Sequence, residues 1–206
     1  MSLLGNLYVI SAPSGAGKTS LVKAAVESMP DILSVSVSHT TRPKRPGEIE
    51  GINYHFTDEA TFQRMEENQE FLEHATVFGY SYGTSRAWVE ETLRKEKDVI
   101  LEIDWQGCQQ IQRLFANCIS IFILPPSLAD LSQRLQKRNQ DNAAVIQQRL
   151  ADATETISHI DEFDYVIVND DFNHALRDLR TIIEAGRLLQ RKQSLKFSNL
   201  IRDLLS

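Results

Sequence analysis

Residues 7–20 read LYVISAPSGAGKTS, and this stretch decides the fold. A short apolar run at residues 7–10 is followed by a glycine-containing loop, and Lys18 and Thr19 then open a segment whose apolar residues recur at helical spacing. A strand, a loop and a helix in this order bind phosphate groups, because backbone N–H groups and the positive end of the helix point at the anion. In such a loop Lys18 reaches the β- and γ-phosphates of a nucleoside triphosphate, and the Thr19 hydroxyl ligates Mg²⁺.

One position departs from the strict pattern of this loop. The strict pattern has Gly at position 12, and this chain has Ala12. Glycine matters where the backbone needs a positive φ or approaches another group closely. The alternative is a simple strand-to-helix turn, which also favours Gly, Ser and Pro. Because Lys18 and Thr19 stand in register behind a strand, we expect residues 12–19 to bind phosphate.

Length, charge and cysteine content exclude several classes of protein. The 206 residues suit one domain, or one core that carries inserted segments. The formal net charge of −6 argues against general binding to nucleic acid or to an anionic membrane. Cys108 and Cys118 form neither a disulfide framework nor a metal-ligand spacing, which indicates buried thiols in a reducing compartment. No signal peptide or membrane-spanning run is apparent, so we expect a cytoplasmic protein.

Apolar strands alternate with amphipathic helices over most of the chain. The expected strands, buried on both faces, are residues 7–11, 99–103, 119–124 and 165–168. Helical faces are expected after Lys18, after Gly107 and after Asp171. This alternation predicts an α/β, doubly wound parallel sheet, with its ligand site at the carboxyl ends of the strands.

Two segments interrupt the alternation. Residues 35–87 are rich in Thr and aromatics and predict a small mixed β/α insertion, with a short helix near 59–68 capped by Thr57. Residues 127–160 are polar and helical, with Ser127 as N-cap and a second helix after Asp141. The core would then comprise residues 1–34, 88–126 and 161–206.

The C-terminal tail also has helical spacing. Apolar residues recur between Leu195 and Leu205, at Leu200, Ile201 and Leu204. The tail would pack either on the core or on another subunit, and the sequence leaves the oligomeric state undecided.

The strand expected at residues 99–103 ends in acidic residues. Residues 98–104 read DVILEID, and the period of two puts Glu102 and Asp104 on the same side of the strand. In enzymes with a phosphate-binding loop, an acidic residue at such a strand end commonly supports the Mg²⁺ shell. The alternative is a solvated carboxylate, and the phosphate-binding loop upstream favours the functional interpretation of Asp104.

Residues 39–48 are a second candidate anion site. Arg42 and Arg45 are held by prolines, which suits bidentate capture of a phosphate, and the hydroxyls of Tyr54 and Tyr82 would complete the pocket. Taken alone, this segment is more often a charged surface loop. Glu73 is likewise open to two interpretations. It is either a surface carboxylate or a reader of guanine, whose N1–H and 2-amino groups form a donor pair that adenine lacks.

Three arginines lie in the helical segment, namely Arg134, Arg138 and Arg149. Phosphoryl transfer spreads negative charge over equatorial oxygens, so arginines that close over the reaction stabilise it and closure excludes water. The alternative is ordinary helix-surface arginine. The five histidines have no spacing that suggests a metal site or a triad, and we assign none of them a catalytic role.

Taken together, these motifs resemble the guanylate kinase family over essentially the whole chain. The segment 36–48 (SVSHTTRPKRPGE) combined with residues 11–20 (SAPSGAGKTS) is highly specific. Weaker motifs add to it: GINYHF at 51–56, EFLEHA at 70–75, YGT at 82–84, LEIDWQG at 101–107 and VIVNDD at 166–171. In this family Ala at position 12 is an accepted variant of the loop.

The resemblance implies a P-loop nucleoside-monophosphate kinase of purine nucleotide metabolism, with a core, a GMP-binding region at 35–87 and a lid at 127–160. It implies the co-substrate ATP, the cofactor Mg²⁺ and the acceptors GMP and dGMP. The ATP-binding residues would be Ala12, Pro13, Ser14, Gly15, Ala16, Gly17, Lys18, Thr19 and Asn169, with Mg²⁺ on Thr19 and Asp104. The GMP phosphate would be held by Arg42, Arg45, Tyr54 and Tyr82, and the guanine by Ser38, Glu73 and Thr84, with Asp104 near the base. The catalytic side chains would be Lys18, Arg42, Arg134, Arg138 and Arg149.

The lid departs from the family pattern. Similar enzymes often read Arg-Gly-Arg-Gly where this chain has QKRN at residues 136–139. Both glycines are absent, which bears on lid flexibility and on the role of Arg138.

Two other functions remain open at this point. Some guanylate-kinase-like domains in scaffold proteins bind phosphorylated partners in place of GMP, but they usually have a degraded phosphate loop, whereas Lys18 and Thr19 are intact here. The second is a kinase that acts on a different acceptor, such as another nucleotide or a ribose phosphate. Glu73, Ser38 and Thr84 would discriminate between these acceptors.

Overall fold

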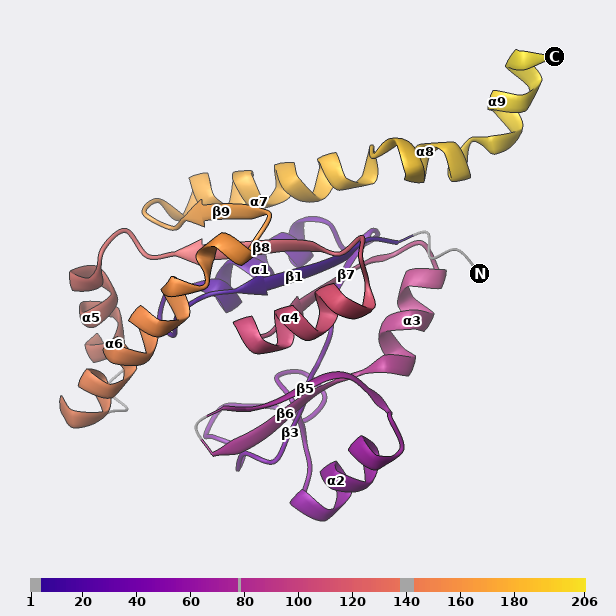
Figure 1. Ribbon diagram of the computed structural model, residues 1–206. Coiled ribbons are helices and arrows are strands. Elements are labelled where there is room, and N and C mark those ends of the chain that lie inside the picture. Colours follow the sequence, from indigo (N-terminus) through magenta and orange to yellow (C-terminus); the bar gives the residue numbers. More distant parts are fainter. Residues whose placement is uncertain (1–4, 78, 138–142) are drawn as a thin grey trace.

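A parallel sheet forms the centre of the molecule (Figure 1). The computed structural model describes residues 5–77, 79–137 and 143–206, and within them five strands pair in the order β2-β7-β1-β8-β9. Every neighbouring pair is parallel. The strands are β1 (Leu7–Ser11), β2 (Leu33–Val35), β7 (Asp98–Glu102), β8 (Ile119–Leu124) and β9 (Tyr165–Val168). The central place of β1 puts the loop that follows it in the middle of the carboxyl edge.

Helices cover both faces of this sheet, as the apolar pattern predicts. Side chains alternate along β1, so that Tyr8 and Ile10 enter one core cluster and Leu7 and Val9 enter the other. The first cluster contains residues of α1 (Lys18–Ser28) and α7 (Phe172–Arg187), and the second contains residues of α3 (Arg86–Arg94) and α4 (Trp105–Leu114). The doubly wound α/β architecture is confirmed.

A second, mixed sheet of order β4-β3-β6-β5 lies below the core in Figure 1. Its strands are β3 (His39–Thr40), β4 (His55–Phe56), β5 (Phe71–Val77) and β6 (Tyr80–Ser85), and α2 (Glu59–Glu67) precedes β5. The expected helix is present, but its predicted cap is wrong by one residue. Asp58 caps α2, because its carboxylate accepts a 2.8 Å hydrogen bond from the Thr61 N–H.

Two helices extend from the core beside the phosphate-binding loop. They are α5 (Leu128–Lys137) and α6 (Ala143–Ser158), and the short 3₁₀ turn η1 (Ile160–Glu162) follows them. Ser127 caps α5 as predicted, since its hydroxyl accepts a 3.0 Å hydrogen bond from the Asp130 N–H. Leu131 and Leu135 are buried and lie against Gly15, so α5 packs on the loop. The boundaries proposed for core, GMP-binding region and lid stay predictions.

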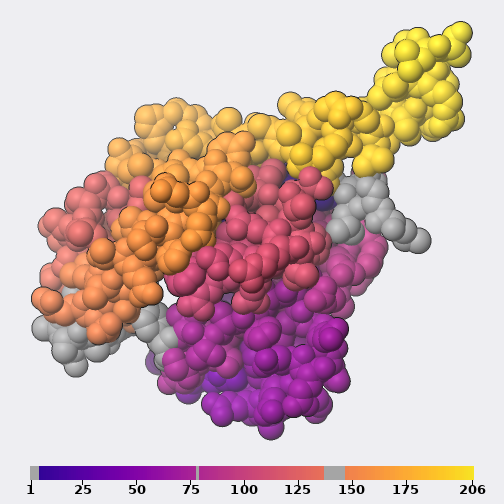
Figure 2. All heavy atoms as spheres, in the orientation of Figure 1, coloured from indigo at the N-terminus to yellow at the C-terminus, as the bar shows by residue number. Residues whose placement is uncertain are grey.

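The C-terminal tail is helical, as expected. It forms α8 (Gln190–Lys196), which contacts the core through a hydrogen bond from Lys192 to the Gly5 carbonyl, and α9 (Ser198–Leu205), which projects from the body (Figures 1 and 2). Leu204 and Leu205 are exposed. In the described part of the chain, no helix combines the length and the apolar character needed to cross a membrane.

Candidate active site

The phosphate-binding loop has two glycines in the left-handed region of φ. Gly15 has φ 94° and Gly17 has φ 95°, a conformation that L side chains rarely adopt. Among the described residues, the non-glycine residues with positive φ are Gln69 and Glu96, so Ala12 adopts an ordinary backbone conformation. The missing glycine at position 12 therefore introduces no φ strain, and the loop closes with its other two glycines.

Side chains from distant segments brace this loop. The Asn169 side chain donates a 2.7 Å hydrogen bond from Nδ2 to the Ala16 carbonyl, and a Cβ at Gly17 would lie 2.3 Å from the same Nδ2. Arg134 of α5 donates to the carbonyl oxygens of Asn169 (3.0 Å) and Ala16 (3.4 Å). Two predicted site residues, Asn169 and Arg134, thus meet at the loop.

Lys18 begins α1 and faces the end of β7. Its Nζ donates a 3.3 Å hydrogen bond to the Ile103 carbonyl. Burial lowers the pKa of Lys18, while the charges of Glu102, Asp104 and Glu73 act in the opposite direction. The ammonium group therefore lies where carboxylates from two parts of the chain converge.

Thr19 contacts a carboxylate that the sequence interpretation did not assign to the metal. Its hydroxyl donates a 2.9 Å hydrogen bond to Glu102 Oε2. Asp104 instead caps α4, because its Oδ1 accepts a 2.8 Å hydrogen bond from the Gly107 N–H. The period of two that drew attention to Asp104 applies equally to Glu102, so the sequence did contain a signal for Glu102.

These groups fit Mg²⁺. Mg²⁺ prefers oxygen ligands and in phosphoryl-transfer sites binds one or two carboxylates together with substrate phosphates and water. The Thr19 hydroxyl and the Glu102 carboxylate supply such oxygens beside the loop. Among the described residues, no three or more His, Cys, Asp or Glu side chains are grouped so that they could hold a metal ion.

Glu73 is a buried carboxylate, only 3% exposed. It lies on β5 at a register shift that follows Phe71, and such a bulge re-aims side chains next to functional sites. The Thr84 hydroxyl of β6 donates a 2.6 Å hydrogen bond to Glu73 Oε1. Burial raises the pKa of Glu73 to about 7, with Asp104 adding to the rise and Thr84 and Lys18 opposing it. The surface-carboxylate interpretation of Glu73 is therefore wrong.

Arg42 lies in an aromatic and acidic pocket of the second sheet. Only 7% of it is exposed, and its NH2 group lies 2.6 Å from Glu48 Oε1. The guanidinium carbon is 5.3 Å from the ring centre of Tyr54, which meets Tyr82 edge to face at 5.9 Å. The structure thus brings together Arg42, Tyr54 and Tyr82, three of the four residues predicted to hold a phosphate. It also shows Glu48 as the ion-pair partner of Arg42, which the sequence interpretation did not include.

The remaining predicted residues are less constrained. Arg45 is exposed, and its backbone N–H donates to Glu48 Oε2 at 2.8 Å. Ser38 is half-buried, and its carbonyl accepts a 2.9 Å hydrogen bond from the His55 N–H. Arg149 lies on α6 and is partly buried, whereas Arg138 falls outside the described residues.

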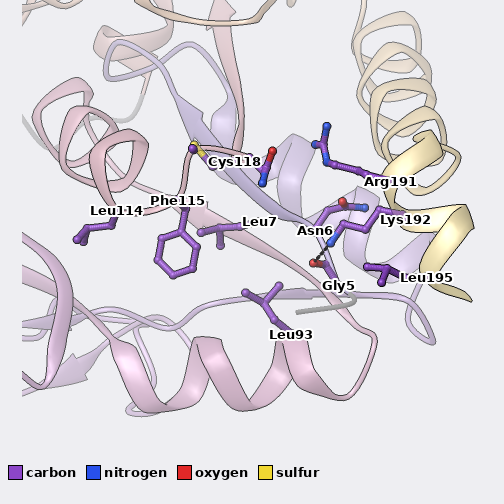
Figure 3. Close-up of a pocket in the computed structure, with 12 residues that line it drawn as sticks. Gly5, Asn6, Leu7, Leu93, Leu114, Phe115, Cys118, Arg191, Lys192 and Leu195 are labelled. Carbon is purple, nitrogen blue, oxygen red and sulfur yellow. Dashed lines mark hydrogen bonds between the residues drawn. The ribbon is translucent and has the colours of Figure 1, made fainter. Parts of the chain in front are cut away.

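A cavity of about 500 Å³ lies elsewhere, at the amino end of β1 (Figure 3). Leu7, Leu93, Phe115 and Leu195 line it, together with Lys192, which donates a hydrogen bond to the Gly5 carbonyl. The phosphate-binding loop follows the other end of the same strand. This cavity is therefore separate from the candidate active site.

Comparison with known proteins agrees with this geometry. A family model described as Guanylate kinase matches residues 4–186. The chain belongs to the guanylate kinase family. It is 54% identical to a guanylate kinase of Nitrosococcus oceani over 98% of both chains, and 55% identical to one of Saccharophagus degradans over the full length of both.

Solved structures show the same relationship. The crystal structure of guanylate kinase from Anaplasma phagocytophilum matches with a TM-score of 0.76 and 34% identity, over 95% of each chain. The SH3-kinase fragment of tight junction protein 3 matches with a TM-score of 0.52 over 91% of this chain and 59% of that one. At 11% identity the second likeness shows a shared fold and carries no argument about function.

Proposed function

We propose that this protein transfers the γ-phosphoryl group of Mg²⁺-ATP to GMP, and to dGMP, which yields ADP and GDP or dGDP. The family to which it belongs phosphorylates GMP with ATP. The observation that carries the proposal is the short segment of chain shared by the two sites. Lys18 of the phosphate-binding loop donates a hydrogen bond to the Ile103 carbonyl, and Gly107, four residues later, closely approaches the buried Glu73 carboxylate. Glu73 and the phosphate-binding loop would therefore serve one site.

On the acceptor side, Glu73 as a carboxylate would accept from the N1–H and 2-amino groups of guanine, with Ser38 and Thr84 beside it. Arg42, Arg45, Tyr54 and Tyr82 would hold the monophosphate, and Asp104 would lie near the base. The short Arg42–Glu48 ion pair supports this, because it fixes the guanidinium before the substrate arrives.

On the donor side, residues 12–19 would surround the ATP phosphates, with Lys18 at the β- and γ-phosphates and Asn169 on the side of the adenine. Thr19 would hold Mg²⁺, with Asp104 acting partly through water and Glu102 supplying the carboxylate that Thr19 already contacts. When bound, Mg²⁺ supplies neutralisation of the charge that develops on the phosphate oxygens.

The protein would accelerate the transfer by positioning and charge neutralisation. A phosphate oxygen of GMP bonds to the γ-phosphorus in line, and the bond from that phosphorus to the β,γ-bridging oxygen breaks, which releases ADP. Arg134 and Arg149, with Arg138 of the same segment, would act from the helical lid on the equatorial oxygens. Arg134 supports this role because it already contacts the phosphate-binding loop through Ala16.

The two alternative functions are less well supported. A module that only binds a partner would not require an intact Lys18 and Thr19, whose proposed roles are to contact the ATP phosphates and Mg²⁺. A kinase for a ribose phosphate would not require the buried Glu73 carboxylate that Thr84 contacts, because a ribose phosphate has no nucleobase to recognise. We also propose a cytoplasmic location in purine nucleotide metabolism, in line with the two free cysteines.

Equilibrium binding tests the acceptor assignment without turnover. Calorimetric titration of the protein with GMP and with AMP should give much tighter binding of GMP, because AMP lacks the donor pair that Glu73 accepts. Equal affinity for the two nucleotides would contradict the proposed acceptor. A Thr19→Ala variant should need more Mg²⁺ for half-maximal turnover, and an unchanged Mg²⁺ requirement would contradict the metal assignment.

A further inference from the structure

Helix α4 lies between the GMP-reading strand and the base of the helical lid. Along it, Trp105, Gln109 and Gln112 are spaced i, i+4 and i+7 and therefore share one face. Gly107 and Gln110 are spaced i and i+3 and share another. The two faces contact different parts of the molecule.

The first face contacts the turn that ends the lid. The rings of Trp105 and His159 are stacked, with centroids 3.6 Å apart and an interplanar angle of 10°. His159 is the residue between α6 and η1. Gln109 donates a 2.9 Å hydrogen bond to Glu162 Oε2, and Gln112 donates one of 2.9 Å to the Glu162 carbonyl. His159 Nδ1 lies 2.7 Å from Glu162 Oε1, which ties the turn to itself.

The second face contacts β5 next to Glu73. Gln110 forms two hydrogen bonds with the His74 backbone, donating to its carbonyl (2.8 Å) and accepting from its N–H (3.2 Å). A Cβ at Gly107 would lie 2.7 Å from Glu73 Oε2, so the helix backbone closely approaches that carboxylate. One rigid helix therefore holds both the guanine-reading strand and the base of the lid.

We propose that Trp105 and His159 are positioning residues that fix the base of the lid on α4, in register with the acceptor site. This inference rests on the proposed function of α5 and α6 as a lid. If the lid were not fixed where it joins the core, its arginines would shift relative to the γ-phosphate. A displacement of about 1 Å lowers transfer rates by up to about 100-fold. The effect falls mainly on transfer, because the residues proposed to bind GMP, apart from Asp104 at the start of α4, all lie between residues 38 and 84.

The variant His159→Ala removes the stack, and His159→Phe keeps a planar ring without its hydrogen bond. The control is His174→Ala, an exposed histidine in the first turn of α7. We expect His159→Ala to lower kcat about tenfold while the KM for GMP changes less than about twofold. His159→Phe should recover most of kcat, and His174→Ala should match the unaltered protein.

Tryptophan fluorescence reports the stack directly, since the chain has only two tryptophans. In a Trp88→Phe background, where the exposed Trp88 is removed, the emission of Trp105 should rise when His159 becomes Ala. A higher emission with unchanged kcat would overturn the proposal, because the stack would then be lost without consequence. A fall in kcat that His159→Phe does not rescue would overturn it as well.

Should His159→Ala fail to fold, Gln109→Ala tests the same anchor, with the exposed Gln106→Ala on the same helix as its control. Gln109→Ala should lower kcat at least twofold, and parity with Gln106→Ala would overturn the proposal. Absence of GMP turnover in the unaltered protein would count against the proposed function. An Arg134→Ala variant with full activity would count against the lid. Either result is distinct from failure of the stack.

Discussion

The Thr84 hydroxyl donates a hydrogen bond of 2.6 Å to Glu73 Oε1, across the antiparallel pair β5 and β6. Glu73 Oε1 is thereby fixed from one side, and the carboxylate stays buried. An acceptor oriented in this way is suited to the donor edge of guanine, which makes Glu73 the residue on which acceptor choice depends.

Glu73→Gln is predicted to reduce the preference for GMP over AMP by about 10- to 100-fold, the range expected when hydrogen bonds to a charged acceptor are lost. ATP binding should change little, because Lys18 and Thr19 are untouched. The ratio of kcat/KM for the two acceptors measures the effect, with Glu27→Gln on the exposed face of α1 as control. An unchanged ratio would remove Glu73 from base reading.

GMP binding is predicted to weaken as the pH falls through about 7. Burial raises the pKa of Glu73 to about 7, so about one tenth of it is ionised at pH 6, and only the carboxylate accepts both donors of guanine. The KM for GMP should rise about tenfold between pH 8 and pH 6. Because the GMP phosphate also titrates at about pH 6, the comparison is with Glu73→Gln, which should show only the phosphate titration. Identical profiles would contradict the prediction.

The same pKa shift predicts that the folded protein is less stable at high pH, where GMP should bind most tightly. Between the ordinary pKa of 4.5 and about 7, the folded protein holds a proton on Glu73 that the unfolded chain releases. The free energy of unfolding therefore falls as the pH rises through this window. Glu73→Gln lacks this titration and should be more stable than the unaltered protein at pH 8 by roughly 1–3 kcal/mol, with a smaller difference at pH 5. Urea unfolding at both pH values measures it, and an equal difference at both would contradict the assignment.

Lys18→Ala is predicted to lower kcat by at least about 100-fold, as the loss of a charge aimed at the transferred group does elsewhere. The fold should survive, because the ammonium donates one hydrogen bond, of 3.3 Å, to the Ile103 carbonyl, and because burying the charged group is itself unfavourable, as its lowered pKa indicates. Circular dichroism checks the fold and steady-state kinetics the rate. Lys23→Ala, on the exposed side of the same helix, is the control, and turnover equal to that control would refute the role of Lys18.

Arg42→Lys is predicted to raise the KM for GMP about 10- to 100-fold, since a lysine cannot reproduce the planar fork that contacts Glu48 and faces Tyr54. The KM for ATP should stay within about twofold. Arg64→Lys, on the exposed side of α2, provides the matched control. A KM for GMP that Arg42→Lys leaves unaltered would place the phosphate elsewhere.

The core could be predicted from its long apolar runs and from the loop motif, whereas the short elements could not be predicted. Strand β2 has three residues, with Ser34 between its two apolar ones, and so carries too little pattern for a strand assignment. The cap of α2 was misplaced because Thr57 and Asp58 are both good caps, and the backbone decides between them.

The site was predictable where a motif specifies chemistry and less so where tertiary contacts decide. Glu102 and Asp104 have similar sequence settings, but the start of α4 engages Asp104 and leaves Glu102 to Thr19. The stack of Trp105 on His159 joins residues 54 positions apart, and no local pattern predicts it. Burial of Glu73 likewise follows from the bulge in β5, which the sequence does not display.

The most direct measurement of the central claim is the release of ADP from Mg²⁺-ATP in a coupled assay, with GMP, dGMP, AMP, UMP, CMP and dTMP offered in parallel. The account predicts turnover with GMP and dGMP and little with the other four, since only guanine presents its donor pair to Glu73. Comparable turnover with AMP, or none with GMP in a folded protein that binds ATP, would contradict it.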